Sequence, residues 1–193
     1  MALTVVTDVT AEPVSLDQQK GHLRMDGDDD DAYISSCIMA ARQWIEGQTK
    51  CAIMDQTWSY GIDYAWPVRF GKYRIDFPLN PVASQGSPET ISVTYVDSDG
   101  ATQTLATSQY TIAARRSGSY IVPAFDVVWP EVRWVPDAIT VQFVAGDSDN
   151  VPQELYRAVM ILAGHYYENR ETAIEAPSAV EALISPFRTV TFR

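Results

Sequence analysis

The sequence has no long apolar run and few cysteines. No stretch approaches the roughly 20 apolar residues that a membrane-spanning helix needs. The first residues contain neither a basic segment nor an apolar core, so no signal peptide is expected. Only Cys37 and Cys51 are present, which is too few for a disulfide framework. We therefore expect two reduced, largely buried thiols and no membrane association.

Basic residues are scarce relative to acidic ones. The 193 residues include 14 Lys and Arg against 25 Asp and Glu, which gives a net charge of −11. A protein that binds nucleic acid tightly neutralises phosphates with clustered Lys and Arg, so this composition argues against a general nucleic-acid binder. An apolar fraction of 46% with 20% charged residues is typical of a globular chain with one core of domain size.

Motifs for catalysis or cofactor binding are also missing. The sequence has no Gly-x-Ser-x-Gly, no phosphate-binding Gly-x-x-x-x-Gly-Lys and no Gly-x-Gly-x-x-Gly. His165 and Glu168 could share one face of a helix, but a carboxylate–histidine metal site in a bundle needs a second such pair. We therefore expect no enzyme activity, no catalytic residues, no metal and no cofactor.

Helical periodicity begins near Ser15. Ser15 and Gln18 form a capping-box pattern, which predicts a short helix that ends between Gly21 and Arg24. A longer helix should follow, and its buried face is formed by Tyr33, Ile34, Cys37, Ile38, Ala41, Trp44 and Ile45. The opposite face of that helix should carry Arg42, Gln43 and Glu46.

An acidic run, Asp28, Asp29, Asp30 and Asp31, precedes the longer helix. A calcium loop that begins at Asp26 would need Gly at its sixth position and Glu at its twelfth, where Asp31 and Cys37 stand. Carboxylates at a helix N-terminus instead satisfy free N–H groups and oppose the positive end of the dipole. We interpret the run as a helix cap. The same carboxylates could also form a solvated or DNA-repelling acidic rim.

Strand patterns occupy the middle of the chain, and helical patterns return at its end. Alternation and turn signals predict strands near 58–64, 73–77, 91–96, 104–105, 110–112, 120–123 and 138–144. A helix from about 153 to 169 is apolar almost all round, and a short helix covers 178–184 before an extended tail, 187–193. The expected fold is α+β: a small helical bundle (1–51 and 146–193) with an antiparallel β-rich subdomain (52–145) inserted between its second and third main helices.

Four tryptophans lie in the β-rich segment: Trp58, Trp66, Trp129 and Trp134. Such side chains could stack on sugars. Adjacent prolines at 67 and 130 favour anchors at strand ends or interface residues instead.

The chain resembles the head-tail connector (adaptor) proteins of long-tailed bacteriophages, prophages and gene transfer agents. The resemblance covers nearly the whole chain in order. It is carried by PVSLDQ (13–18), DDDD (28–31), AARQWIE (40–46), QTW (56–58), FPLNPV (77–82), YVD (95–97), DG (99–100), WP (129–130), VQFVAG (141–146), VP (151–152), GHYYENRE (164–171) and VEALISPFR (180–188). The stretch from Pro123 to Pro136 has no close counterpart.

The resemblance implies a structural protein of the virion. Such proteins form a ring, usually of twelve protomers, that binds the portal on one side and a tail-side stopper or tail terminator on the other. Double-stranded DNA passes through the channel without specific binding, and the protein is made in the cytoplasm of the bacterial host. Portal docking through a C-terminal extension would map to Phe187, Arg188, Val190, Phe192 and Arg193.

Two further interpretations follow from the residues themselves. The C-terminal tail alternates apolar and polar residues, so it could add a strand to a partner sheet. The acidic run Asp28–Asp31 could form a channel rim to which DNA does not stick. The alternative to a connector is a β-rich carbohydrate- or protein-binding accessory module of the tail, which exposed tryptophans would support.

Overall fold

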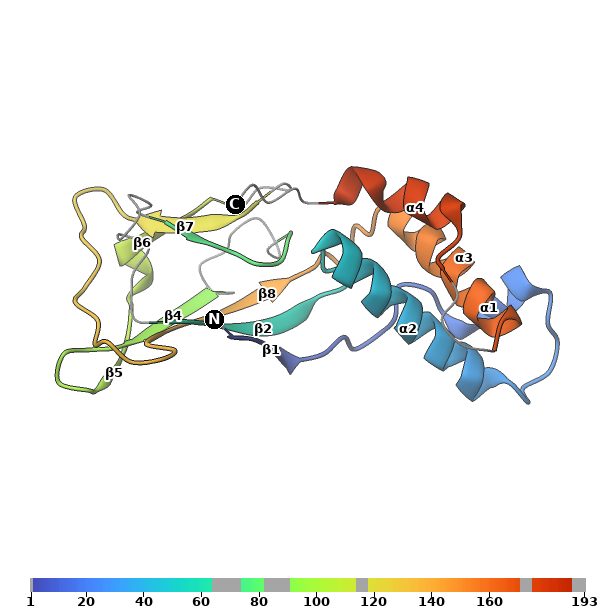
Figure 1. The fold of residues 1–193 in the computed structure, drawn as a ribbon, viewed down its shortest axis with the longest axis horizontal. Coiled ribbons are helices and arrows are strands. Elements are labelled where there is room, and N and C mark those ends of the chain that lie inside the picture. The colour runs from blue at the N-terminus through green and yellow to red at the C-terminus, as the bar shows by residue number, and fades with distance from the viewer. Residues whose placement is uncertain (1, 64–73, 82–90, 114–117, 171–174, 189–193) are drawn as a thin grey trace. The chain divides into compact units, whose positions relative to one another are not determined.

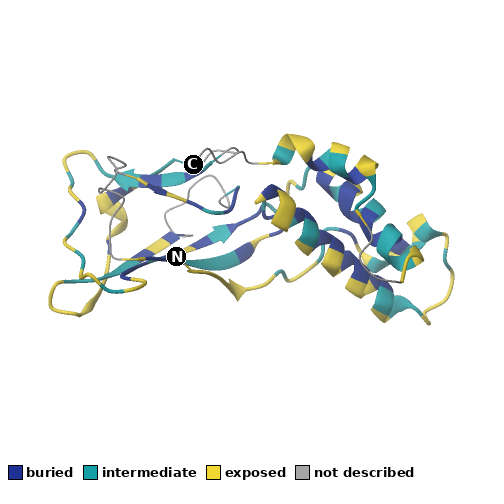
Figure 2. Ribbon diagram, viewed as in Figure 1, coloured by how far each residue is buried: buried dark blue, intermediate teal, exposed yellow. Residues whose placement is uncertain are grey.

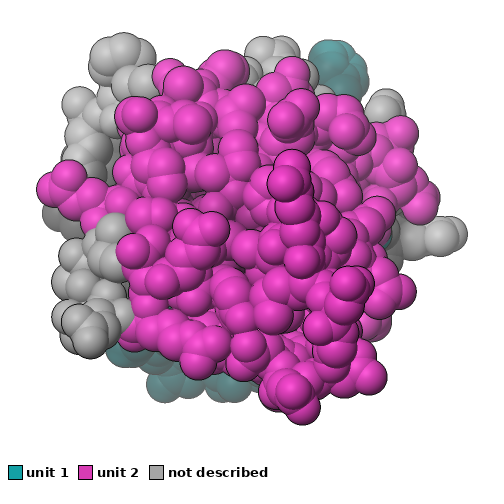
Figure 3. All heavy atoms as spheres, turned by 90° about the vertical axis from the view of Figure 1, so that its right-hand side faces the viewer, with its two compact units in different colours: residues 1–8, 55–146 teal, residues 9–54, 147–193 magenta. Residues whose placement is uncertain are grey.

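The structure is a computed structural model that describes residues 2–63, 74–81, 91–113, 118–170 and 175–188. The chain forms two compact units. The sheet unit comprises residues 1–8 and 55–146, and the helical unit comprises residues 9–54 and 147–193 (Figures 1 and 3). None of the described helices combines the length and the hydropathy that crossing a membrane requires.

The helical unit contains four α-helices within the described residues: α1 (Leu16–Leu23), α2 (Asp31–Thr49), α3 (Gln153–Glu168) and α4 (Ser178–Ile184), which a 3-10 turn, η5 (Ser185–Phe187), follows. The predicted capping box is confirmed. Ser15 Oγ accepts from the Gln18 backbone N–H at 3.2 Å, and the Ser15 N–H donates to Gln18 Oε1 at 2.8 Å. Helix α3 contacts α1, α2 and α4, as its all-round apolar sequence predicted.

The core of the helical unit lies between these helices (Figure 2). Apolar side chains spaced three and four residues apart on α2 and α3 face each other, so each helix buries one face against the other. The fully buried members include Ile34, Ile38, Ala41, Ile45, Leu155, Val159, Leu162 and Ile184. This set confirms the predicted apolar face of α2.

The described residues of the sheet unit form two antiparallel sheets. One has the strand order β1-β2-β8-β4-β5, with β1 (Ala2–Thr7), β2 (Gln56–Ile62), β8 (Ile139–Ala145), β4 (Ile91–Val96) and β5 (Thr102–Thr104). The other has the order β3-β7-β6, with β3 (Ile75–Asp76), β7 (Tyr120–Pro123) and β6 (Tyr110–Ala113), which a 3-10 turn, η4 (Thr107–Gln109), precedes. Strands β2 to β8 fall between α2 and α3 in the chain, so the predicted α+β class with a β-rich insertion is confirmed.

Contacts between the two sheets form the core of the sheet unit. Alternate residues of β8 (Ile139, Val141, Phe143 and Ala145) are fully buried, as period-2 alternation requires when one face of a strand meets the core. The rings of Phe77 and Phe143 pack at 4.8 Å between centroids. The hydroxyl of Tyr110 on β6 donates to the carbonyl of Ile91 on β4 at 3.0 Å, and this bond also joins the sheets.

The N-terminal residues differ from expectation. Residues 1–8 were assigned to the helical bundle. Instead, β1 pairs antiparallel with β2, with Leu3 opposite Tyr60 and Val5 opposite Trp58. The pairing joins residues 50 or more positions apart, so local periodicity around β1 alone does not reveal it.

Candidate functional site

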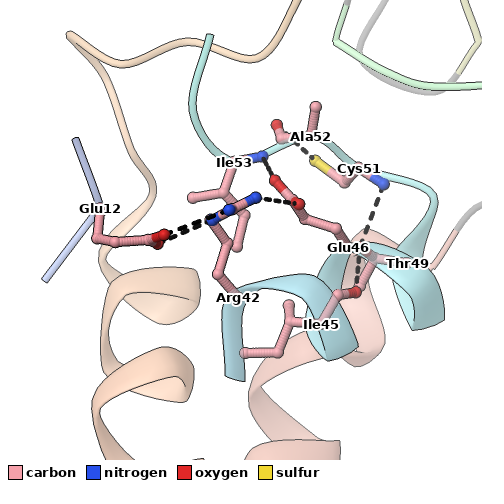
Figure 4. A network of polar contacts seen from close by, with 8 residues as sticks. All are labelled: Glu12, Arg42, Ile45, Glu46, Thr49, Cys51, Ala52 and Ile53. Atoms are coloured by element: carbon pink, nitrogen blue, oxygen red, sulfur yellow. Dashed lines mark hydrogen bonds and ion pairs between the residues drawn. The ribbon is translucent and has the colours of Figure 1, made fainter. Parts of the chain in front are cut away.

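The side chain of Arg42 on α2 is buried and pairs with two carboxylates (Figure 4). Its Nε and Nη2 atoms donate to the two carboxylate oxygens of Glu12 at 2.8 and 3.2 Å, and Nη1 donates to Glu46 Oε2 at 2.9 Å. A bidentate carboxylate with a second carboxylate compensates the desolvation of a guanidinium. The prediction that Arg42 lies on the exposed face of its helix is therefore wrong. Glu12, 30 residues earlier, supplies the partner.

The Arg42 network also holds chain segments that lead between the two units. Glu46 Oε1 accepts from the backbone N–H of Ile53 at 2.8 Å, and the Ile53 carbonyl accepts from the N–H of Asp147 at 3.5 Å. Glu12, Ile53 and Asp147 each lie within four residues of a point where the chain passes from one unit to the other. The network thus fixes the helical-unit end of all three crossings.

The acidic run lies where α1 leads into α2. Lys20 Nζ forms ion pairs with Asp28 and Asp31, each at 2.8 Å. The hydrogen bond to Asp28 is the main reason that the pKa of Lys20 is raised, and the bond from Lys20 lowers the pKa of Asp28. These contacts hold the start of α2 against α1.

Asp30 faces the C-terminal end of α3. Its carboxylate accepts from the Tyr167 hydroxyl at 2.6 Å and pairs with Arg170 at 3.3 Å. The guanidinium of Arg170 also lies over the rings of Tyr33 and Tyr167, at 4.8 and 5.3 Å from their centroids. The hydrogen bond from Tyr167 lowers the pKa of Asp30 and raises the pKa of Tyr167.

The interpretation of the acidic run as a side-chain cap is wrong for Asp30. Asp30 occupies the N-cap position of α2, but its side chain makes no capping hydrogen bond. The Asp30 carbonyl instead accepts from the N–H of Ile34 at 2.8 Å, and the carboxylate is committed to Tyr167 and Arg170. The carboxylate of Asp30 therefore binds residues about 140 positions away in the sequence and makes no hydrogen bond to the N–H groups at the start of α2.

The Asp30 cluster predicts an acid-dependent loss of stability. Because its pKa is lower in the folded chain than in the unfolded chain, Asp30 stabilises the fold above about pH 4. This contribution disappears as the pH falls through the folded pKa. We expect Asp30→Asn to be less stable than the wild type at pH 7, and the difference to shrink toward zero as the pH falls toward 2. Urea unfolding at each pH measures it.

Asp29→Asn is the matched control for this experiment. Asp29 is exposed in the same run and takes no part in the contacts of Lys20 or Arg170 described above. An Asp30→Asn effect that stays constant from pH 7 to pH 2, or that equals the effect of Asp29→Asn, would contradict the assignment.

The candidate docking residues at the C-terminus fall into two groups. Phe187 lies in η5 and packs against the core of the helical unit, so the expectation of an extended tail from residue 187 is wrong for this residue. The guanidinium of Arg188 pairs with Glu181 of α4. Val190, Phe192 and Arg193 lie outside the described residues.

The tryptophans do not share one environment. Trp129 is buried and Trp58 is half-buried, whereas Trp134 is 71% exposed. Trp66 lies outside the described residues. Trp129 thus fits the expected anchor, whereas the exposure of Trp134 is expected both of an interface residue and of the alternative binding module.

The described residues contain no cluster of three or more His, Cys, Asp or Glu side chains that could hold a metal ion. His165 Nδ1 lies 3.2 Å from the side-chain amide of Asn169, and Glu168 is exposed beside it. His165 and Glu168 line a shallow cavity of about 300 Å³, together with other residues of α1 and α3 and with Arg24 and Pro177.

Comparisons with known proteins agree with this architecture. A family model described as phage gp6-like head-tail connector protein matches residues 13–66, which span α1, α2 and β2. Among curated proteins, no relative matches. Three solved structures match 100% of this chain and 98% of their own chains.

The three structures come from gene transfer agent (GTA) particles. The neck of an empty GTA particle, computed with C6 symmetry, is 25% identical with a TM-score of 0.82. The virion of a native GTA particle is 27% identical with a TM-score of 0.79. The neck of a native GTA particle, computed with C12 symmetry, is 26% identical with a TM-score of 0.77.

Both kinds of comparison lead to structural components of phage-like particles. They confirm the resemblance that the sequence motifs carry. The chain is a head-tail connector (adaptor) protein of such a particle.

Proposed function

We propose that copies of this chain form a ring of twelve subunits at the head–tail interface of a phage-like virion. The ring binds the portal on one side and a stopper or tail terminator on the other, and it extends the channel through which double-stranded DNA passes. The observation that carries the proposal is the full-length match to a neck structure computed with C12 symmetry. The protein acts without catalysis and is made in the host cytoplasm.

Portal docking uses the end of the chain. Residues 189–193, Thr-Val-Thr-Phe-Arg, alternate polar and apolar side chains, a pattern that can add a strand to the edge of a partner sheet. Phe187 and Arg188 hold the start of this segment on the helical unit through the core contact and the Glu181 ion pair. We therefore divide the five candidate residues into two anchors, 187 and 188, and three contact residues, Val190, Phe192 and Arg193.

The acidic run contributes a rim of the channel in this proposal. Asp28 is exposed although it pairs with Lys20, and Asp29 is exposed as well. Lys20 and Arg170 balance two of the four carboxylates of the run, so it stays net negative. Like charge keeps DNA phosphates from binding tightly. Tight binding of duplex DNA by the isolated ring at low salt would contradict this role.

Truncation after Arg188 tests the docking proposal. Light scattering and electron microscopy of the wild-type chain with the portal of the same particle should show ring-sized complexes. The truncated chain should lose portal binding and keep the circular dichroism spectrum and the melting temperature of the wild type. A truncated chain that still binds the portal would contradict the docking role. A full-length chain that stays monomeric and never binds the portal would contradict the connector ring itself.

A further inference from the structure

The sheet unit exposes an apolar strand at one edge of its five-stranded sheet. Leu3, Val5 and Val6 of β1 are 38%, 47% and 51% exposed, and we call them the β1 patch. Strand β1 pairs with β2 on one side, and no described strand pairs with its other side. The residues of β1 and β2 include no charged side chain, so a partner could cover this ribbon without desolvating a charge. An uncharged, open apolar edge favours association.

A second apolar patch lies on the loop between β7 and β8. Phe125, Val128 and Trp134 are 101%, 87% and 71% exposed, and we call them the loop patch. Large exposed side chains of this kind, Trp above all, are common at the centres of protein interfaces. In Figure 1 this loop runs beside the β4–β5 hairpin.

Backbone contacts fix the loop patch to the sheet unit. The N–H of Ala124 donates to the Gln109 carbonyl at 3.0 Å, and the N–H of Arg133 donates to the Val96 carbonyl at 2.9 Å. Trp129, between these points, is buried. The loop thus presents its apolar side chains from a defined position, so little conformational entropy is lost when they are covered.

The β1 patch and Trp134 of the loop patch lie at opposite edges of the five-stranded sheet. The β1 patch is on the first strand of the order β1-β2-β8-β4-β5. Arg133, next to Trp134, has its guanidinium against Gly100 in the turn between β4 and β5, at the other end of that order. Because both patches belong to one compact unit, their relative placement is fixed.

A cyclic ring requires each copy to offer two different surfaces, one to each neighbour. We propose that the loop patch of one copy packs on the β1 patch of the next copy. This proposal rests on the ring proposed above. It identifies the two surfaces through which neighbouring subunits of that ring associate. Further copies of this chain can cover both patches. In a head-to-tail ring, each copy uses its loop patch toward one neighbour and its β1 patch toward the other.

Two variants and a control test the contact by sedimentation velocity and native mass spectrometry of the full chain. Val5→Glu places a charge on the β1 patch, and the double variant Phe125→Ser/Trp134→Ser removes the aromatic side chains of the loop patch. Each should weaken association by roughly 30-fold or more, the effect of losing an interface hot spot. Met39→Ser should leave association unchanged, because Met39 is 47% exposed on α2 of the helical unit. All four chains should melt at similar temperatures, since the altered side chains are exposed.

Mixing the two variants gives the sharper result. The Val5→Glu chain keeps its loop patch and the double variant keeps its β1 patch, so together they can make one contact and no second. We expect a one-to-one dimer under conditions where the wild type forms dimers and larger oligomers. Variants that assemble like the wild type, or a mixture that forms no dimer under those conditions, would overturn this contact and leave the ring intact. Wild-type chain that never assembles, even with the portal, would overturn the ring and the contact together.

Discussion

Replacing Arg42 by alanine should lower the free energy of unfolding by about 3–5 kcal/mol. The guanidinium is 1% exposed and neutralises Glu12 and Glu46, whose side chains are themselves largely buried. Alanine would remove the cation that lies between two neighbouring carboxylates in a site from which water is mostly excluded. The two carboxylates would then repel each other and lose three charge-assisted hydrogen bonds. The loss should therefore exceed that of an ordinary surface ion pair, which contributes about 0–1 kcal/mol.

Two further variants make the Arg42 prediction specific. Arg42→Lys keeps the charge but cannot reproduce the two-pronged contact with Glu12, so its loss should be intermediate. Arg157→Ala changes an exposed arginine on α3 and should stay within about 0.5 kcal/mol of the wild type. Chemical denaturation followed by circular dichroism measures all three. A loss below about 1 kcal/mol for Arg42→Ala would show that the network does not stabilise the fold.

The Arg42 network also shows where sequence-based prediction ends. The buried face of α2 was predictable because apolar residues at three- and four-residue spacing identify it locally. Arg42 lies next to that face and was placed outside it, since a charged residue is rarely fully buried without a partner. The partner, Glu12, precedes α1 and belongs to no periodic element. Burial of a paired charge depends on tertiary structure, and no local pattern encodes it.

The same distinction separates the predicted strands from the missed one. Strands β4, β7 and β8 occur within one or two residues of the predicted positions because alternation and turn residues mark them locally. Strand β1 was not predicted, although Leu3 and Val5 alternate with threonines. So short an alternation does not establish a strand, and its pairing with β2, far along the chain, is what defines β1. The β1 patch therefore became visible only with the fold.

The candidate site was predicted in part. The acidic run was recognised as a feature of the start of α2, but the partners of Asp30 are Tyr167 and Arg170 at the end of α3. The connector class itself came from the order and spacing of weak motifs along the whole chain, and the family model and the GTA structures confirm it. No single residue carries that class, because the function of a connector lies in extended surfaces rather than in a compact group of side chains.

Phe143→Ala should destabilise the sheet unit by about 3–5 kcal/mol. Phe143 is completely buried on β8, opposite Trp58 on β2 and Ile91 on β4, and it packs against Phe77, which follows β3 of the second sheet. Alanine removes the ring and leaves a cavity that the two hydrogen-bonded neighbouring strands cannot close. Gln142→Ala, one residue earlier and exposed, should change stability by less than about 0.5 kcal/mol. Equal losses for the two variants in urea unfolding would contradict the assigned core.

The Phe143 variant also separates stability from assembly. Phe143 lies on β8, the middle strand of the sheet whose edge carries the β1 patch, and its buried side chain contributes to neither patch. At a temperature where hydrogen exchange shows β8 still protected, Phe143→Ala should therefore assemble like the wild type and lose assembly only as the sheet unit opens. Val5→Glu should show the reverse, with a wild-type melting temperature and impaired assembly. If Phe143→Ala fails to assemble while β8 stays fully protected, the core and the contact surfaces are coupled, and association depends on the packing inside the sandwich as well as on its exposed edges.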